Sequence, residues 1–156
     1  MSEPVSQQAM SNLETSNLAM SPEEMAQLHA AAFTQSRPWS QDEFASLLGS
    51  PLTFAAGNAQ AFALVRVIVD EAELLTIATN PAHQRQGLGR KTMQTWQRLA
   101  QTRGADTAFL EVAADNSAAH SLYLSEGFVA CGRRPGYYCR ENAASVDAIV
   151  MRKNLR

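Results

Sequence analysis

The stretch Asn80-Pro81-Ala82-His83-Gln84-Arg85-Gln86-Gly87-Leu88-Gly89-Arg90-Lys91 lies between a strand-like apolar segment and an amphipathic helical pattern. Gly87 and Gly89 stand at the entry of the predicted helix, where a backbone without Cβ atoms can approach a ligand closely. The free N–H groups of the first helical turn and the positive end of the helix dipole suit a pyrophosphate. Arg85 and Arg90 add positive charge. The stretch therefore predicts a phosphate-binding turn, and the alternative is a glycine-containing loop with incidental arginines.

Two other kinds of glycine-rich turn do not fit these residues. A dinucleotide fingerprint needs a third glycine where Thr92 stands. A P-loop needs a glycine upstream of Lys91-Thr92 at a position where none occurs. Neither a dinucleotide-binding nor a P-loop fold is therefore predicted.

Helical and strand patterns extend outward from this turn. Capping signals at Ser21-Pro22-Glu23-Glu24 and Ser40-Gln41-Asp42-Glu43 predict two helices, which end near Phe33 and at Gly49. Two further helices are predicted over Leu88–Arg103 and Ser117–Glu126. Strands are predicted over Leu52–Ala56, Gln60–Val69, Glu73–Thr79, Thr107–Ala113, Phe128–Arg133 and Val146–Arg152, with one more conceivable near Glu14–Met20. This order predicts an α/β fold with a mixed sheet, early antiparallel hairpins and a β-α-β crossover.

Length and composition restrict the classes of protein that the chain can belong to. It has 156 residues, enough for one domain, and 46% of them are hydrophobic while 18% are charged, which argues against wholesale disorder. No apolar run reaches the length of a membrane span, and the first residues do not form a secretory signal. The two cysteines, Cys131 and Cys139, exclude a disulfide scaffold and suit a reducing cytoplasm. We expect a flexible tail over residues 1–11 and a single domain over residues 12–156.

The formal charge of −2 is unevenly distributed along the chain. Residues 1–78 carry nine acidic and two basic side chains, whereas residues 79–156 carry eleven basic and six acidic ones. The basic half suits an anionic ligand and the acidic half a cationic one, although solvated faces would explain the same pattern. No basic stripe with interleaved aromatic residues occurs, so direct binding of nucleic acid is not predicted.

The motif Gln84-x-x-Gly87-x-Gly89 resembles the Q/R-x-x-G-x-G/A signature of the GNAT superfamily of N-acetyltransferases. Leu75–Pro81 and Phe109–Asn116 resemble the strands of that family on either side of its phosphate turn. Arg134-Pro135-Gly136-Tyr137-Tyr138 and Asp147–Met151 resemble the C-terminal signature of its RimI branch, which acetylates the N-terminal alanine of a small-subunit ribosomal protein. The branch often carries an acidic residue before Asp147, and its absence here puts the peptide specificity in question.

The resemblance implies acetyl-CoA as cosubstrate and assigns a set of cofactor-binding residues. It implies that the central strand carries a bulge and splays from its neighbour, so that pantetheine fills the gap and a backbone N–H of this strand meets the oxyanion. Asn116 is an ordinary N-cap by position, and the resemblance adds a contact with pantetheine. The implied cofactor-binding residues are Ile77, Ala78, Thr79, Arg85, Gln86, Gly87, Leu88, Gly89, Arg90 and Asn116.

Glu111 and Tyr123 are the candidate catalytic residues. Glu111 is an ionisable side chain inside the apolar strand pattern Ala108–Ala113, which suits a general base, although a solvent-facing Glu on an edge strand would show the same pattern. Tyr123 lies on a short helix and would ordinarily be a packed aromatic residue. The resemblance implies that Glu111 accepts the proton of the amine and that Tyr123 protonates the thiolate of coenzyme A, so we expect both beside one thioester.

Other side chains leave alternatives open. Trp39, Tyr137 and Tyr138 would either wall a peptide groove or pack at its rim. Asp70, Glu71 and Glu73 would either attract a basic peptide or form a solvated strand rim. No His, Cys and carboxylate spacing indicates a metal site, so we expect none.

The sequence therefore predicts a cytoplasmic, acetyl-CoA-dependent acetyltransferase that modifies the N-terminal amine of a protein, in the first place the N-terminal alanine of a ribosomal protein. The transfer is expected to be direct, without a covalent enzyme intermediate. The alternatives are a GNAT enzyme that acts on a small amine or on lysine, and a fold that binds acyl-CoA without catalysis. No membrane partner is expected, and the sequence does not determine the oligomeric state.

Overall fold

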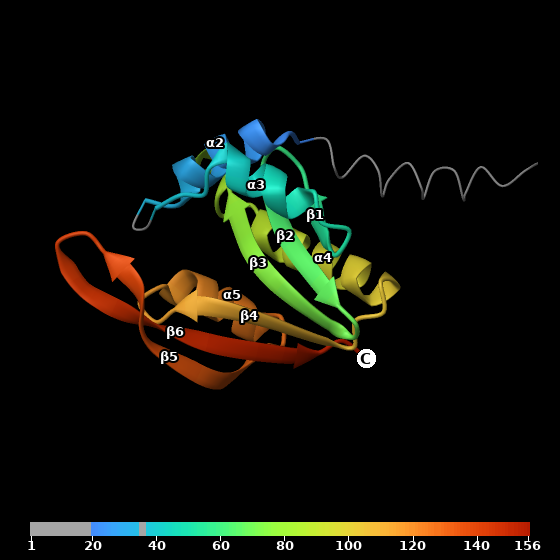
Figure 1. The fold of residues 1–156 in the computed structure, drawn as a ribbon. Helices are drawn as coiled ribbons and strands as arrows, with labels where there is room; N and C mark the ends of the chain where they lie inside the picture. Colours follow the sequence, from blue (N-terminus) through green and yellow to red (C-terminus); the bar gives the residue numbers. More distant parts are fainter. Residues whose placement is uncertain (1–19, 35–36) are drawn as a thin grey trace, which may run out of the picture.

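The computed structural model describes residues 20–34 and 37–156, which form one twisted sheet with helices against both of its faces (Figure 1). The helices are α2 (Pro22–Ala32), α3 (Gln41–Leu48), α4 (Leu88–Thr102) and α5 (Ser117–Ser125), and η1 (Pro81–His83) is a 3-10 turn. The strands are β1 (Thr53–Gly57), β2 (Ala61–Ile68), β3 (Glu71–Thr79), β4 (Thr107–Ala113), β5 (Val129–Arg140) and β6 (Ala143–Asn154). This architecture confirms the predicted mixed α/β fold. The tail expected over residues 1–11 and the strand considered near Glu14 lie outside the described residues.

Serine caps begin the two helices that precede the sheet. The Ser21 hydroxyl accepts a hydrogen bond from the N–H of Glu24, 3.1 Å away. Ser40 and Glu43 form a complete capping box, because each side chain also accepts from the backbone N–H of the other residue. These bonds satisfy donors that a helix start otherwise leaves unpaired. The sequence therefore predicted both starting points correctly.

The sheet consists of two antiparallel parts joined by a short parallel contact. Its strand order is β1-β2-β3-β4-β6-β5, and all neighbours are antiparallel except β3 and β4. The parallel pairing covers only Glu71–Glu73 of β3 and Thr107–Phe109 of β4. Beyond these residues the two strands separate. The splay that the resemblance implies is therefore present, and it lies between the predicted phosphate strand and the strand of Glu111.

A β-bulge changes which face of the sheet the end of β3 presents. The register with β2 shifts between Leu64 and Val65, so that Leu75 is an extra residue in β3. One extra residue inverts the alternation of side chains beyond it. Leu74 before the bulge and Ile77 after it accordingly pack in the same cluster under α4. Beyond the bulge, the side chains of β3 therefore face the opposite sides of the sheet from those that an unbroken alternation would give them, and Ile77 packs under α4.

The core lies on both faces of the sheet. The larger cluster, beneath α4 and α5, contains the fully buried Met93, Trp96 and Phe128. The smaller cluster joins α2 and α3 to the opposite face of β1–β3 through Phe44 and Phe62. Because α2 and α3 cover only this part of that face, the β4 part of the same face stays open.

The last two strands are longer than the sequence predicted. β5 and β6 form one hairpin whose turn lies at Glu141-Asn142, and Asn142 has a positive φ of 56°. No strand was predicted between Arg133 and Val146, but much of that stretch is paired in the hairpin, with Tyr138 opposite Val146. The expectation of short strands over 128–133 and 146–152 is therefore wrong in extent, because long-range pairing outweighs the weak local strand propensity.

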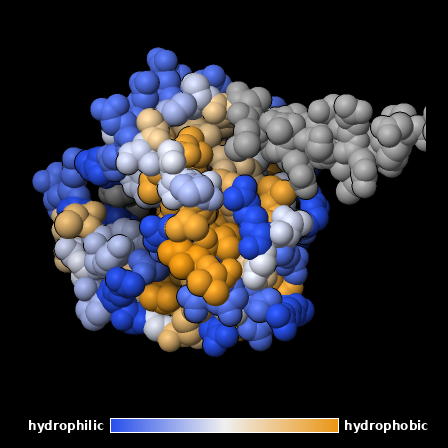
Figure 2. All heavy atoms as spheres, turned by 45° about the vertical axis from the view of Figure 1, so that its right-hand side comes forward, coloured by the Kyte–Doolittle hydropathy of each residue, from blue (hydrophilic) through white to orange (hydrophobic). Residues whose placement is uncertain are grey.

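Apolar side chains also gather on the surface of the domain. Figure 2 shows them as a band in the middle of one face, surrounded by hydrophilic side chains. Leu52, Ile68 and Val69 are large apolar residues that stay exposed at the end of the sheet where β2 finishes. None of the described helices is long and apolar enough to cross a membrane.

Candidate functional site

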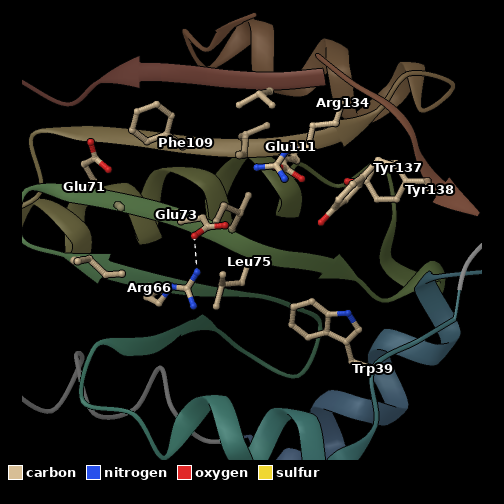
Figure 3. Close-up of a pocket in the computed structure, with 15 residues that line it drawn as sticks. Trp39, Arg66, Glu71, Glu73, Leu75, Phe109, Glu111, Arg134, Tyr137 and Tyr138 are labelled. Atoms are coloured by element: carbon tan, nitrogen blue, oxygen red, sulfur yellow. Dashed lines mark hydrogen bonds and ion pairs between the residues drawn. The ribbon is translucent and has the colours of Figure 1, made fainter. Parts of the chain in front are cut away.

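A pocket of about 630 Å³ opens on the face of the sheet that points away from α4, which we call the pocket face. It extends from the segment between α2 and α3, across β2, β3 and β4, to the β5–β6 hairpin (Figure 3). Its mouth carries aromatic and charged side chains, and its floor is largely strand backbone and apolar groups. The principal lining residues are Trp39, Arg66, Ile68, Glu71, Glu73, Leu75, Phe109, Glu111, Arg134, Tyr137, Tyr138 and Val150.

Glu111 lies in the pocket beside the opening between β3 and β4. Its strand β4 lies inside the sheet, between β3 and β6, so the interpretation as an edge-strand Glu is wrong. Its register partner is Val150 of β6, which also lines the pocket. Its side chain is 23% exposed and can reach a ligand in the pocket. Glu111 therefore lies where a ligand in the pocket can contact it.

Arg134 pairs with Glu111, and the sequence analysis did not single it out. The Arg134 Nε lies 2.8 Å from the Glu111 carboxylate in an ion pair, and the guanidinium carbon lies 5.5 Å from the centre of the Tyr137 ring. Arg134 comes from β5, which reaches β4 only through β6. The sequence signal was its place at the start of Arg134–Tyr138, the stretch that resembles the RimI signature, and this gave Arg134 no partner. Contact with Glu111 depends on a register that spacing along the chain does not reveal.

Tyr123 lies on the other face of the sheet. It is buried in the cluster under α4, where its ring packs against Phe128 at a centroid distance of 6.4 Å. Burial raises the pKa of Tyr123, and the nearby Tyr138 raises it further. Tyr123 does not line the pocket, and Glu111 and Tyr123 lie on opposite faces of the sheet. The expectation that both lie beside one thioester stays a prediction.

The predicted phosphate-binding turn has the geometry of an anion site. Gly87 has a φ of 75° and begins α4 without a side-chain cap, and the first helical bond runs from the Lys91 N–H to the Gly87 carbonyl. The N–H groups of residues 88–90 precede that bond and are available to a ligand. A Cβ added to Gly87 would meet no atom within 4 Å, whereas one on Gly89 would lie 3.3 Å from Leu122. The turn therefore offers open space at Gly87 and a close helix contact at Gly89.

The charged groups of this turn differ in their partners. Arg90 donates to Ser125 over 3.2 Å and lies 3.6 Å from Glu126, so it joins α4 to the end of α5. Arg85 and Gln86 are exposed in the turn, and Arg85 has a positive φ of 65°. A pyrophosphate at the turn would thus meet backbone donors first and the exposed Arg85 second.

Comparison with known proteins agrees with this geometry. Residues 13–128 match the Acetyltransferase (GNAT) family. The chain belongs to the GNAT acetyltransferase family. It is 39% identical over 146 residues to the [ribosomal protein bS18]-alanine N-acetyltransferase of Escherichia coli, a match that covers 91% of this chain and 94% of that protein. The crystal structure of the ribosomal-protein-S18-alanine N-acetyltransferase from Escherichia coli superposes with a TM-score of 0.77 at 34% identity, over 86% of this chain and 87% of that one.

Two further GNAT proteins extend the comparison. The N-alpha-acetyltransferase RimI of Mycobacterium tuberculosis is 34% identical over 138 residues, which cover 83% of this chain and 84% of that protein. Arabidopsis thaliana NAA60, solved in complex with acetyl-CoA, shares the fold with a TM-score of 0.73 at 14% identity, over 86% of this chain and 93% of that one. The predicted GNAT fold and the predicted resemblance to RimI enzymes are confirmed, and this GNAT protein is an acetyltransferase.

Asn116 and its neighbour join α5 to the hairpin of this acetyltransferase. The Asn116 side chain caps α5 by accepting from the N–H of Ala119 over 3.2 Å, as its position predicted. Asp115 accepts two hydrogen bonds from Arg140 of β5, at 2.9 and 3.2 Å. The Arg140 guanidinium holds the pKa of Asp115 below its usual range. These contacts fix the end of α5 that points toward the splay.

His29 is a buried residue that the sequence analysis missed. The Trp39 N–H donates to His29 Nδ1 over 3.0 Å, so the proton of the neutral ring lies on Nε2, which donates to the Thr76 hydroxyl over 3.0 Å. Burial lowers the pKa of His29 to about 4. The ring therefore links the pocket wall at Trp39 to β3 just beyond its bulge. The spacing of His29 from Met25, on one face of α2, was the available signal.

The described residues hold no group of three or more His, Cys, Asp or Glu side chains that would suit a metal ion. Trp39, Tyr137 and Tyr138 all line the pocket, which favours the groove-wall interpretation over simple rim packing. Glu71 and Glu73 also line it, and Glu73 pairs with Arg66 at 2.7 Å.

Proposed function

We propose that this acetyltransferase transfers the acetyl group of acetyl-CoA to the N-terminal α-amino group of a protein, in the first place the N-terminal alanine of a small-subunit ribosomal protein. The observation that carries the proposal is an open, aromatic-walled pocket that ends at Glu111 beside the gap between β3 and β4. The activity named for the relatives, at 39% identity over nearly the whole chain, supports the same acceptor. We place the reaction in the bacterial cytoplasm, where ribosomal proteins are made.

The acceptor amine would enter from the pocket face. An α-amino group has an ordinary pKa of about 7.7–8.0, so a weak base is enough to deprotonate it at neutral pH. Glu111 is the base in this proposal, either by direct contact or through one water. Arg134 holds the Glu111 carboxylate at 2.8 Å and would yield one of its oxygens to the incoming ammonium group. Trp39 and Tyr137 would flank the first residues of the peptide.

The acyl donor would bind from the α4 face. Acetyl-CoA supplies the acetyl thioester, and the open space at Gly87 with the free N–H groups of residues 88–90 suits its pyrophosphate. The edge of Ile77–Thr79 that faces β4 has no strand partner there, which leaves backbone donors for pantetheine and for the thioester oxygen. The remaining proposed contacts are Arg85, Gln86, Leu88, Gly89, Arg90 and Asn116.

Tyr123 would act as the general acid of this transfer. Because burial raises its pKa, its hydroxyl keeps the proton at any pH at which the enzyme is assayed. The Tyr123 proton would pass to the sulfur as the carbon–sulfur bond breaks. Glu111 would already hold one proton from the attacking ammonium group, the second nitrogen proton would leave to solvent as the amide forms, and Glu111 and Tyr123 would return to their starting states by proton exchange with solvent. The two roles suit residues on opposite faces of one gap.

A peptide comparison tests the acceptor. Two matched peptides share one sequence with an internal lysine: the first begins with a free alanine, and the second has its N-terminus blocked. Free small amines are the third substrate. Mass spectrometry is expected to show acetylation of the first peptide alone, at its α-amino group. Acetylation of the blocked peptide at lysine, or of the free amines only, would support the alternative GNAT activities. Binding of acetyl-CoA without acetylation of any member of a proteome-derived peptide pool would favour the non-catalytic alternative.

A further inference from the structure

The β5–β6 ladder contains a large irregularity next to the pocket. Arg134 pairs with Ala148 and Tyr138 pairs with Val146, so residues 135–137 of β5 stand opposite the single residue Asp147 of β6. Three residues against one force the backbone of β5 to bulge away from its partner. Gly136, at the middle of the bulge, has a positive φ of 60°.

The Asp147 carboxylate binds both sides of this bulge. One oxygen accepts from the Gly136 N–H over 2.8 Å, and the other accepts from the Arg133 Nε over 2.6 Å. These two contacts hold the pKa of Asp147 below its usual range. Its own carbonyl accepts from the Ala114 N–H over 2.9 Å, which ties this part of β6 to the end of β4. Asp147 therefore connects the bulge to the strand that carries Glu111.

The bulge in turn carries the side chains that stand over the pocket. Arg134 and Tyr138 flank it, and Tyr137 lies within it. All three line the pocket, and Arg134 reaches Glu111 from there. In Figure 3, Tyr137 and Tyr138 stand side by side at the end of the pocket next to Glu111 and Arg134. A change in the path of residues 135–137 would thus move the acceptor wall without touching the phosphate-binding turn.

We propose that Asp147 is a positioning residue for the acceptor: its carboxylate fixes the 135–137 bulge and thereby places Arg134, Tyr137 and Tyr138 around the amine at Glu111. This inference rests on the proposed function, because it assigns the residue to the acceptor side of the same site. Asp147 itself does not line the pocket, so it acts only through the residues that it holds.

Steady-state kinetics with the alanine peptide test the proposal. Asp147→Ala is expected to raise KM for the peptide at least tenfold and to leave KM for acetyl-CoA within twofold of the wild-type value. The peptide KM of Asp147→Asn is expected to lie between those of the wild type and Asp147→Ala, because the Asn amide oxygen can still accept from the Gly136 N–H. The matched control is Asp106→Asn, which weakens another aspartate–arginine pair, with Arg156 at 2.7 Å, at a residue outside the pocket lining. A peptide KM for Asp147→Ala within twofold of wild type, or parallel rises in both KM values, would overturn the proposal.

Hydrogen exchange provides a readout that needs no acceptor. The amides of residues 136–138 are expected to exchange at least tenfold faster in Asp147→Ala than in wild type or Asp106→Asn, with intermediate rates in Asp147→Asn, while those of β4 keep their rates. Unchanged exchange at these amides would refute the role of Asp147 even if peptide kinetics changed. If the wild-type enzyme acetylates no peptide, the proposed function fails. Faster exchange of residues 136–138 in Asp147→Ala would then still support the conclusion that Asp147 fixes the bulge.

Discussion

At the scale of single residues, Glu111 offers the most direct test of the chemistry. Glu111→Gln keeps the shape of the side chain but removes the base, so turnover of the peptide is expected to fall by about 10²-fold or more. The affinity for acetyl-CoA, measured by calorimetry, is expected to stay the same. The matched control is Glu73→Gln, which also breaks a carboxylate–arginine pair in the pocket, at 2.7 Å from Arg66. Equal losses in both variants would show that Glu111 contributes only charge to the pocket.

Substitution of Tyr123 tests its proposed role as the general acid. Tyr123→Phe removes the hydroxyl and keeps the ring against Phe128, so the fold is expected to persist while kcat falls by about 10²-fold. Because the pKa of Tyr123 is raised above that of an ordinary tyrosine, its deprotonation does not reduce wild-type kcat between pH 7 and 10. A pH–rate series checks both points. A kcat that declines in wild type but not in Tyr123→Phe as the pH approaches 10 would contradict the raised pKa.

His29 predicts how stability depends on pH. Its pKa is about 4 in the folded protein and about 6.5 in the unfolded chain, so the unfolded chain binds more protons between these values. Stability is therefore full above about pH 6.5 and falls as the pH drops toward 4, by on the order of 1–2 kcal/mol at pH 5. Paired carboxylates with lowered pKa values, such as Glu43 and Asp115, lose their contribution only at lower pH.

Urea unfolding at pH 7.5 and pH 5 measures this effect. Wild-type protein is expected to lose stability between the two values, and His29→Gln is expected to be less stable at pH 7.5 but nearly insensitive to the change. An equal loss in both proteins would assign the pH dependence to other groups.

At the scale of elements, the sequence predicted those helix and strand limits that depend on neighbouring residues alone. Serine caps predicted the starts of α2 and α3, and the strand β4 was predicted with its observed limits. The extra residue Leu75 in β3 and the pairing of Arg134 with Glu111 were not predictable from the residues, because each depends on register between strands. For the same reason the bulge at residues 135–137, whose Gly136 is bonded by Asp147 of the neighbouring strand, was not predicted.

The two ends of α4 carry glycines that form a matched pair for mutation. Gly87 and Gly104 stand at opposite ends of the helix, and both have a positive φ, at 75° and 93°. Alanine at either position has open space but a strained backbone, which costs about 1 kcal/mol. Gly87→Ala and Gly104→Ala are therefore expected to lower the melting temperature to a similar extent. Only Gly87→Ala is expected to raise the Kd for acetyl-CoA, because its methyl group and altered backbone face the proposed pyrophosphate site. Equal Kd values would argue against that site.

At the scale of the whole molecule, the sheet separates the two substrates of the proposed reaction, with the acceptor on one face and the acyl donor on the other. The three register pairs between β3 and β4 hold its two antiparallel parts together, and the strands diverge toward the site. Glu111 faces the pocket from one part, while α4 and its phosphate-binding turn follow β3 in the other. Two substrates that enter from opposite faces would meet in the gap without sharing an entrance. Figure 1 shows β4 and β6 leading away from β2 and β3 as the strands approach the site.

This arrangement predicts that acetyl-CoA stabilises the molecule in a particular place. A ligand at 100 times its Kd adds about 2.7 kcal/mol to the stability of the folded state. If pantetheine fills the gap, hydrogen exchange should slow most at residues 75–79 of β3 and 110–113 of β4, where the parallel pairing has ended. Adenosine 3′,5′-bisphosphate, which has no pantetheine, serves as the control: it is expected to protect residues 87–91 and to leave the splayed strands unchanged. Protection of both strands by this control ligand, or of neither strand by acetyl-CoA, would mean that the gap between β3 and β4 is not the donor channel.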